Sequence, residues 1–407
     1  MEYLKRVHMS ELNGMSWEEK EKVSERVIGI TKGEVNEIIK INSLARKLEI
    51  FIRHASTDSL GLLLENLKIL DVHNKNITYA LESILKRIED HKILTDAYKS
   101  LVEKVSKLVC KNITKSLRSK GTNHIIRALL RIDHKSEGLK DEMKALPMGH
   151  FLEESTRSAT YAEYLVRAES SERERVVAYL VESMRVENVK NYNSFLYEIA
   201  CRFASREQLD KMYAVIRPVL MDICKDPVGN YFMQAFVSAF SAQTVYAEIE
   251  GEVHTFQANN NVLHKLLIRA AEEGAVHVLE SAVKRVFRQD QLMHTLLFHG
   301  ADGFDSKSYK LGVKYLQVPT RYREEMQVQC LGLYEAFWVR NRIGQEIIVE
   351  LLRSGLGTEL KTLFLSTLCR DLVGIKEARG GEKVLDAMWK VADAGVRRKI
   401  SAVRSRE

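Results

Sequence analysis

A short pattern recurs along this 407-residue chain: a small residue, two polar or aromatic residues, two apolar residues, a polar residue and then further apolar ones. Its clearest copy is Gly229-Asn230-Tyr231-Phe232-Met233-Gln234-Ala235-Phe236-Val237. Further copies begin at Thr122, Ala162, Asn259, Gly344 and Gly381, with neighbouring copies 30, 37 or 40 residues apart and two longer gaps of 67 and 85 residues. Units of about 20–45 residues are typical of solenoid proteins, in which each repeat buries its apolar face only against its neighbours. The spacing therefore predicts a repeat protein.

Each longer gap has room for one weaker copy of the pattern. The candidates are Asn193-Ser194-Phe195-Leu196-Tyr197 and Ser308-Tyr309-Lys310-Leu311-Gly312, and a further weak copy stands at Gly61-Leu62-Leu63-Leu64-Glu65. The competing explanation is that short amphipathic helices resemble one another by chance.

The residue pattern within the repeats is helical. Apolar residues recur at helical spacing almost throughout, strand-like alternation is rare, and only 4 of 407 residues are proline. Asp226 and Pro227 are expected to start a helix, as N-cap and first helical residue. We predict an all-α superhelical solenoid that forms a single domain over residues 1–407, with about 8–11 repeats, several of them degenerate. Residues 1–20 are expected to be a loose N-terminal segment.

Composition and motifs favour a binding protein inside the cell. The net charge of +7 is modest, and the five cysteines include no C-x-x-C pair, as expected in a reducing compartment. No signal peptide and no membrane-spanning run is visible. The chain lacks nucleotide-binding, zinc-protease and serine-hydrolase motifs, so we expect no enzyme and no cofactor. A loose polar group has irregular spacing and indicates no metal site: His294, His299, Asp302 and Asp305.

These copies resemble the Pumilio (PUF) RNA-binding repeat, whose middle helix presents one stacking residue and two residues that read a base edge. Asn230-Tyr231-Phe232-Met233-Gln234 matches its full Asn-Tyr-x-x-Gln form after Gly229. Other copies are most similar to the nucleolar protein nine family, with a Gly-Ser-His-Val-Leu-Arg type of repeat at Asn123-His124-Ile125-Ile126-Arg127. That family also has a last repeat like Gly381-Glu382-Lys383-Val384-Leu385-Asp386-Ala387-Met388-Trp389, followed by a basic helix. The resemblance implies single-stranded RNA bound along a concave face.

The resemblance also implies which residues contact RNA. Asn230 and Gln234 share one side of a helix, and their amides suit the mixed donor and acceptor edge of uracil, on which Tyr231 would stack. His124 and Tyr164 take the stacking position in their copies, and Arg127 and Arg167 take the second edge position, where arginine holds backbone more than it reads sequence. The remaining members of the predicted base-contacting set are Asn123, Asn260, Asn261 and His264.

A basic stripe is visible without any family comparison. Between Lys86 and Lys135 there are 13 Lys or Arg residues against 5 Asp or Glu residues. Five of the cations step by three or four residues and are expected to form one stripe along a single helix, where they would bind phosphates: Lys104, Lys107, Lys111, Lys115 and Arg118. The alternative is a solvated helix face, although such faces normally mix both signs of charge.

The prediction is a monomeric RNA-binding protein of the nucleolus or nucleus that binds small-subunit (18S) pre-rRNA and acts as a pre-40S ribosome biogenesis factor. Other pre-ribosomal assembly factors are expected partners, and membranes are not. One alternative is a cytoplasmic PUF-type regulator of mRNA, which needs a more complete run of base-reading sets. Another is a HEAT- or armadillo-like scaffold that binds only protein, for which the Asn230 set and the basic stripe have no purpose.

Overall fold

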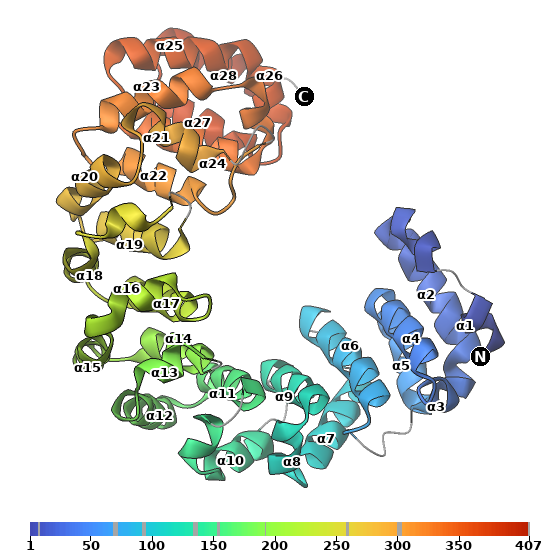
Figure 1. The fold of residues 1–407 in the computed structure, drawn as a ribbon. Coiled ribbons are helices and arrows are strands. Elements are labelled where there is room, and N and C mark those ends of the chain that lie inside the picture. Colours follow the sequence, from blue (N-terminus) through green and yellow to red (C-terminus); the bar gives the residue numbers. More distant parts are fainter. Residues whose placement is uncertain are drawn as a thin grey trace. The chain divides into compact units, whose positions relative to one another are not determined.

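The computed structural model describes residues 1–6, 9–67, 72–91, 95–132, 137–152, 155–191, 193–257, 260–298 and 303–405. These residues are almost all helical, and the β-pairing among them is an isolated bridge between Phe298 and Phe304. The predicted all-α solenoid fold is confirmed (Figure 1). The chain divides into two compact units, Met1–Gln208 and Leu209–Glu407, which are described separately below.

The first unit is a row of helices that alternate between long and short. In chain order they are α1 (Glu2–Arg6), η1 (Met9–Gly14), α2 (Trp17–Thr31), η2 (Lys32–Glu34), α3 (Val35–Ile38), α4 (Asn42–His54), α5 (Thr57–Asn66), α6 (Lys75–His91), α7 (Asp96–Cys110), α8 (Ile113–Arg118), α9 (Lys120–Ile132), α10 (Glu137–Ala145), η3 (Met148–Leu152), α11 (Ser155–Arg167), α12 (Ser170–Glu182), α13 (Val186–Val189) and α14 (Ser194–Phe203). Helix α15 (Arg206–Ile216) contains the boundary between the units.

The second unit continues the same alternation. Its helices are η4 (Arg217–Val219), α16 (Leu220–Lys225), α17 (Gly229–Ala239), α18 (Ala242–Ile249), η5 (Val253–Thr255), α19 (Asn261–Glu272), α20 (Val276–Arg285), η6 (Gln289–Gln291), α21 (Leu292–Leu297), α22 (Tyr309–Gln317), α23 (Arg323–Leu333), η7 (Ala336–Arg340), α24 (Arg342–Arg353), α25 (Thr358–Leu368), η8 (Cys369–Asp371), α26 (Leu372–Glu377), α27 (Gly381–Val391) and α28 (Ala394–Arg404).

Each well-formed repeat has a short first helix, a middle helix and an outer helix, as in α16, α17 and α18. The middle helices of successive repeats pack side by side. In the first unit the order is α4, α6, α9, α11, α14, with α2 against α4, and in the second unit it is α17, α19, α22, α24, α27. Their apolar sides form the core, and side chains such as Leu129, Phe232, Leu266 and Ile348 are fully or almost fully buried. Burial of this kind, against neighbours in the row, is the source of stability in a solenoid.

Glycine occupies the first turn of three middle helices because a side chain does not fit there. A Cβ atom on Gly229, Gly344 or Gly381 would lie 3.2, 2.5 or 1.6 Å from the carbonyl oxygen of the residue six positions earlier. That residue belongs to the short first helix of the same repeat, so the glycine lets the first and middle helices meet closely. The small residue of the repeat pattern is therefore a packing requirement, separate from any ligand.

The turn before α17 differs slightly from the sequence expectation. Asp226 does act as a cap, since its Oδ1 accepts hydrogen bonds from the backbone N–H groups of Val228 (2.8 Å) and Gly229 (2.7 Å). Pro227, however, lies in the turn, and the helix begins two residues later, at Gly229. The cap thus fixes the start of α17 at Gly229, the residue whose close approach to Ile223 is described above.

The described part of the N-terminal segment is packed. Leu4 in α1 is fully buried, and Lys47 Nζ donates hydrogen bonds to the carbonyl oxygens of Leu4 (3.1 Å) and Lys5 (3.0 Å). Ser16 and Glu19 form a reciprocal capping box at the start of α2. Residues 1–20, expected as a loose segment, therefore include helices that join the first unit.

Among the described helices, none combines the length and the apolar character needed to cross a lipid bilayer. The five cysteines are free thiols, and three of them, Cys201, Cys224 and Cys330, are buried. Burial raises the pKa of the Cys224 thiol to about 12, so this thiol is protonated and unreactive at neutral pH.

Candidate nucleic-acid interface

The middle helix α17 has one exposed side. Tyr231 is 57% exposed, Gln234 and Ala235 are half-buried, and Ser238 is exposed. These residues lie three, four and seven positions apart, so they share one side of the helix. The opposite side is buried and consists of Phe232, Met233, Phe236 and Val237. We call the four positions equivalent to Tyr231, Gln234, Ala235 and Ser238 the shared face.

The same alternation of buried and exposed residues fixes the register of the other middle helices. The residues equivalent to Tyr231 are Tyr79 in α6, His124 in α9, Ala159 in α11, Phe195 in α14, Asn261 in α19, Lys310 in α22, Glu346 in α24 and Lys383 in α27. The shared-face residues of α6 and residues of α4 line one groove, and the shared-face residues of α24 and α27 line another. Because successive middle helices pack side by side, their shared-face positions follow one another along the row within each unit.

On α17 the structure brings the predicted Asn230, Tyr231 and Gln234 together. Asn230 Nδ2 donates hydrogen bonds to the carbonyl oxygens of Asp226 and Pro227, both at 2.8 Å. Gln234 Nε2 donates to Asn230 Oδ1 at 3.0 Å. Asn230 therefore positions Gln234, and Gln234 keeps its Oε1 acceptor and one N–H donor for a base edge beside the exposed ring of Tyr231.

A second set of this kind lies on α14, where the sequence shows only a weak copy of the pattern. Phe195 is 52% exposed at the position equivalent to Tyr231, and Glu198 stands at the position equivalent to Gln234. Glu198 Oε1 is buried and has no hydrogen-bond partner among the described residues. Burial raises the pKa of the Glu198 carboxyl, while a hydrogen bond from Ser194 acts in the opposite direction. The predicted set lacks Phe195 and Glu198, although their spacing matches that of Tyr231 and Gln234.

The prediction that Tyr164 is a stacking residue is wrong. Tyr164 is only 2% exposed and packs against Tyr161, with ring centroids 5.1 Å apart. The burial pattern of α11 places Ala159, and not Tyr164, at the position of Tyr231, so the predicted copy is out of register by five residues. Tyr164 corresponds to the core residue Phe236.

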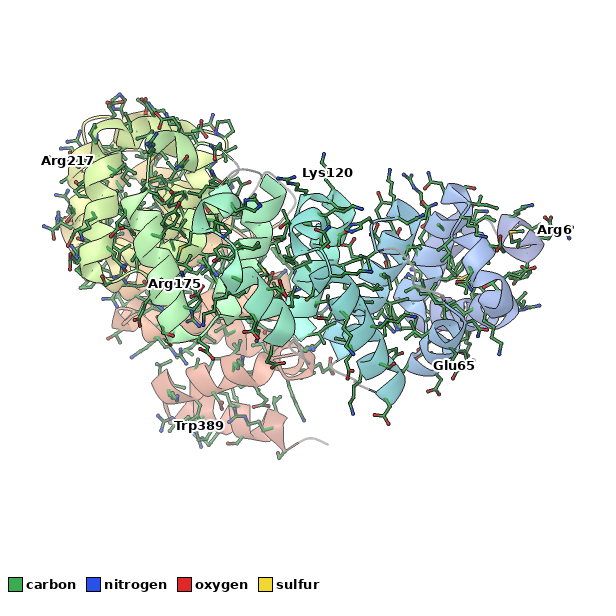
Figure 2. All side chains as sticks on the ribbon, turned by 90° about the horizontal axis from the view of Figure 1, so that it is seen from below. Arg6, Glu65, Lys120, Arg175, Arg217 and Trp389 are labelled. Atoms are coloured by element: carbon green, nitrogen blue, oxygen red, sulfur yellow. The ribbon has the colours of Figure 1, made fainter. Side chains whose placement is uncertain are left out.

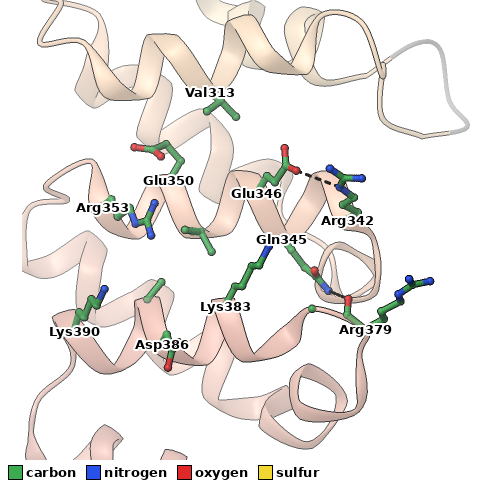
Figure 3. Close-up of a pocket in the computed structure, with 13 residues that line it drawn as sticks. Val313, Arg342, Gln345, Glu346, Glu350, Arg353, Arg379, Lys383, Asp386 and Lys390 are labelled. Carbon is green, nitrogen blue, oxygen red and sulfur yellow. Dashed lines mark hydrogen bonds and ion pairs between the residues drawn. The ribbon is translucent and has the colours of Figure 1, made fainter. Parts of the chain in front are cut away.

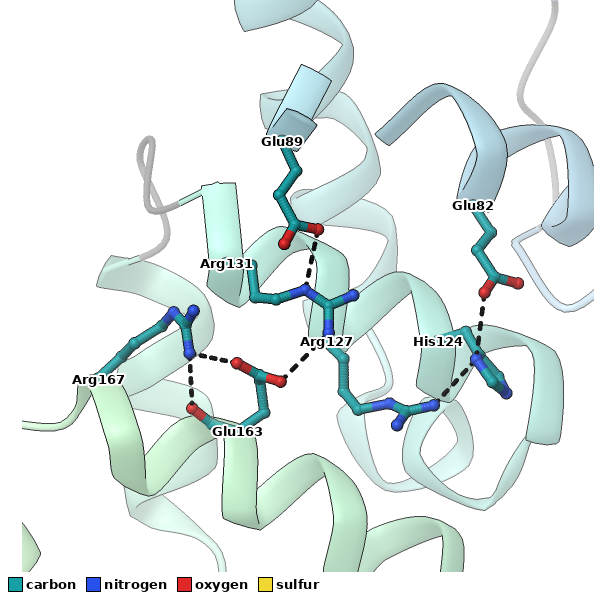
Figure 4. A network of polar contacts seen from close by, with 7 residues as sticks. All are labelled: Glu82, Glu89, His124, Arg127, Arg131, Glu163 and Arg167. Atoms are coloured by element: carbon teal, nitrogen blue, oxygen red, sulfur yellow. Dashed lines mark hydrogen bonds and ion pairs between the residues drawn. The ribbon is translucent and has the colours of Figure 1, made fainter. Parts of the chain in front are cut away.

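The predicted contact residues His124, Arg127 and Arg167 belong to a network of polar contacts that joins α6, α9 and α11 (Figure 4). His124 Nδ1 lies 2.9 Å from Arg127 Nη2 and 3.2 Å from Glu82 Oε1 of α6. Arg131 contacts Glu89 (2.9 Å) and Glu163 (3.2 Å), and Glu163 also pairs with Arg167. Burial lowers the pKa of Arg127, which is nevertheless charged at neutral pH. This network ties α6, α9 and α11 together.

Two further members of the predicted set are buried and cannot meet a base without rearrangement. Asn123 is 2% exposed, and His264 is 5% exposed although it stands at the position equivalent to Gln234. Asn260 caps α19, with its side-chain oxygen accepting from the backbone N–H of Leu263 at 3.0 Å. Asn261 is exposed on the shared face and stays a candidate contact.

The predicted basic stripe does not lie on one helix. Lys104 and Lys107 are in α7 and Lys115 and Arg118 are in α8, because Asn112 ends the first helix and caps the second, accepting from the backbone N–H of Lys115 at 3.1 Å. All five cations, including Lys111 at the cap of α7, are exposed, and none forms an ion pair with a described carboxylate. Lys120, at the start of α9, is exposed as well (Figure 2). The stripe thus occupies an outer helix and a first helix, away from the shared face.

The described residues contain no group of three or more His, Cys, Asp or Glu side chains that could hold a metal ion. His299 and Asp302 of the loose polar group lie outside the described residues. The side chains on the shared face thus include aromatic rings, amides, carboxylates and cations, which are groups that can bind a ligand.

No protein-family model and no curated protein matches this sequence. Solved structures do match. The structure of APUM23, a PUF-family protein, with GGAUUUGACGG has a TM-score of 0.65 at 13% identity, covering 99% of this chain and 92% of that chain. The structure of APUM23 with its insert region deleted, with GGAAUUGACGG, has a TM-score of 0.64 at 14% identity over the same shares. These similarities show that this chain has the Pumilio-repeat fold.

Proposed function

We propose that this Pumilio-repeat chain binds single-stranded RNA along the shared face of its middle helices. The observation that carries the proposal is the set on α17: an exposed Tyr231 ring beside a Gln234 amide that Asn230 holds in place. Aromatic side chains stack on bases of any identity, whereas amides and carboxylates distinguish base edges. The APUM23 structures with bound sequences support the same kind of ligand for this fold.

The shared face uses two modes of contact. Tyr231 with Gln234 and Phe195 with Glu198 are suited to stack on a base and read its edge. Lys310 and Lys383, at the position equivalent to Tyr231, are exposed, form no ion pair with a described carboxylate and are suited to hold phosphates. The protein therefore reads a few bases within a longer strand that it holds mainly by charge.

We further propose that the RNA is small-subunit pre-rRNA and that the protein acts in the nucleolus as a monomeric pre-40S assembly factor, by binding and not by catalysis. The resemblance of the Asn123 and Gly381 copies to the nucleolar protein nine family supports this finer assignment. A short run of base-reading sets also fits a ribosome assembly factor better than an mRNA regulator that must read a complete site.

Two experiments test the proposal. Fluorescence anisotropy with labelled single-stranded RNAs is expected to show binding that weakens with salt, as phosphate contacts require. Crosslinking in cells, followed by sequencing of the attached fragments, is expected to enrich precursor regions of the small-subunit rRNA. Enrichment of mRNA 3′ ends would contradict the pre-rRNA assignment and favour a cytoplasmic PUF-type mRNA regulator. An absence of RNA binding in vitro would contradict RNA binding altogether and favour a scaffold that binds protein.

A further inference from the structure

A groove of about 890 Å³ lies between α24 and α27 in the second unit (Figure 3). Its lining includes all four shared-face residues of each helix: Glu346, Val349, Glu350 and Arg353 on α24, and Lys383, Asp386, Ala387 and Lys390 on α27. Val313 of α22, which is equivalent to Gln234, also contributes. Because α17, α19, α22, α24 and α27 pack in one row, the groove lies along the same row of shared-face positions as Tyr231.

In this groove, none of the side chains at the positions equivalent to Tyr231 and Gln234 is an aromatic ring or an unpaired amide or carboxylate. Val349, at the position of Gln234 on α24, is apolar, and Asp386, its equivalent on α27, pairs with Arg404 at 2.6 Å. Gln345 is 6% exposed, and its Nε2 donates to the carbonyl oxygens of Val339 (2.7 Å) and Arg379 (3.2 Å). Glu346 pairs with Arg342 at 3.4 Å. A base entering here would find no aromatic ring, and the carboxylates equivalent to Tyr231 and Gln234, Glu346 and Asp386, are already paired with arginines.

The groove instead presents cations. Arg353, Arg379, Lys383 and Lys390 line it, all four are exposed, and none forms an ion pair with a described carboxylate. Figure 3 shows Arg353 and Lys390 at one end of the groove, Arg379 at the other, and Lys383 between them. Glu350 is the remaining acidic group of the lining, so positive charge predominates among the groups left free.

We propose that the groove between α24 and α27 binds the sugar–phosphate backbone of the RNA strand and reads no base. This inference rests on the proposed function and deepens it. Unpaired cations favour phosphates because they release the counterions condensed on the strand. An acidic protein segment would satisfy the same cations, but the groove shares its register with the stacking and amide residues of α17, which favours a strand that runs along the row. The last two repeats therefore supply affinity without sequence preference.

The first test compares RNAs of different sequence. The triple variant Arg353→Gln/Lys383→Gln/Lys390→Gln is expected to weaken binding of all single-stranded RNAs by the same factor. It should also reduce the slope of log affinity against log salt by about 0.7 per lost contact, or about 2 in all. The matched control is Arg370→Gln/Arg398→Gln/Lys399→Gln, which removes three exposed cations outside the groove and should change neither quantity.

The second test locates the contact on the RNA. Uncharged methylphosphonate linkages are placed one at a time along the preferred RNA. Some of them are expected to weaken binding of the wild-type protein but to cause no further loss in the triple variant, because the same contact has already been removed. If wild type binds RNA and every linkage costs the same in both proteins, the groove is not a phosphate site. If wild type binds none of the RNAs, the proposed function itself fails.

Discussion

Gln234 Nε2 donates a hydrogen bond to Asn230 Oδ1 at 3.0 Å, while both amide hydrogens of Asn230 bond to backbone carbonyls of the preceding turn. The sequence pattern predicts that the two side chains read one base together. In the structure the two side chains have different roles. Asn230 positions Gln234, and Gln234 presents its free Oε1 and one N–H to a base. One acceptor beside one donor matches uracil, whose N3–H donates and whose carbonyl oxygens accept.

Gln234→Ala is expected to cost about 1–3 kcal/mol on the preferred RNA and to relax the preference at one nucleotide only. Gln234→Glu should move that preference from uracil to guanine, because a carboxylate only accepts and guanine offers two adjacent donors. The measurement is binding to RNAs varied at each position. A variant that binds every RNA as the parent does would show that α17 reads no base.

The stacking residues should behave differently from the edge readers. Tyr231→Ala and Phe195→Ala are each expected to weaken binding by about 1–3 kcal/mol with little change in which base is preferred. Tyr164→Phe serves as the control, because Tyr164 is buried and the change retains its ring. A loss of base preference in Tyr231→Ala without a loss of affinity would contradict stacking.

The contact between Glu198 and RNA is expected to depend on pH. Its carboxyl has a raised pKa in the free protein because it is buried, and it must be ionised to act purely as an acceptor toward the N–H donors of guanine. The contribution of this contact to affinity is therefore present at high pH and lost as the pH falls through the raised pKa. Glu198→Gln should remove this part of the pH dependence and weaken the guanine preference. An unchanged pH profile in Glu198→Gln would assign the dependence to another group.

The repeat spacing predicts the fold because each repeat buries the same apolar positions, and that periodicity is visible in the chain itself. It cannot fix the register of α11, where apolar residues occur on both sides of the helix and the repeat pattern puts Tyr164 on the shared face. The spacing of Phe195 and Glu198 is visible in the sequence. Their copy of the repeat pattern has no glycine at its start, however, so it is recognised only as a weak copy. The ion pairs of Glu163 with Arg131 and Arg167 depend on which helices become neighbours, which no local pattern reveals.

The basic stripe is a second case in which the spacing of residues in the sequence does not determine the structure. Its spacing suits one continuous helix, but Asn112 is a favourable N-cap and starts a new helix at Ile113.

Because the stripe lies off the shared face, the effect of Lys107→Gln/Lys111→Gln/Lys115→Gln should depend on RNA length. A strand confined to the shared face should bind as before, whereas a longer strand should bind more weakly with a lower salt slope. Equal weakening of short and long RNAs would place the stripe on the main binding path.

The glycines in the first turn of α17, α24 and α27 give a stability prediction. Alanine is the better helix former by roughly 0.5–1 kcal/mol, so an unconstrained Gly→Ala change should stabilise a helix. At Gly332, in α23, no atom lies within 4 Å of the position that a Cβ would take, and Gly332→Ala is expected to show that gain. At Gly381 the added Cβ would lie 1.6 Å from the carbonyl oxygen of Ile375, so α26 and α27 must separate.

Overpacking of this kind typically costs about 1–3 kcal/mol, which exceeds the gain in helix propensity, so Gly381→Ala should destabilise the last repeat. Native-state hydrogen exchange should show the loss in α26, α27 and α28 first, since each repeat of a solenoid contacts only its neighbours. The same change should weaken RNA binding through the groove between α24 and α27 while leaving the preference read by Gln234 intact. Equal protection of α27 in Gly381→Ala and the parent would mean that the close contact with Ile375 is not required.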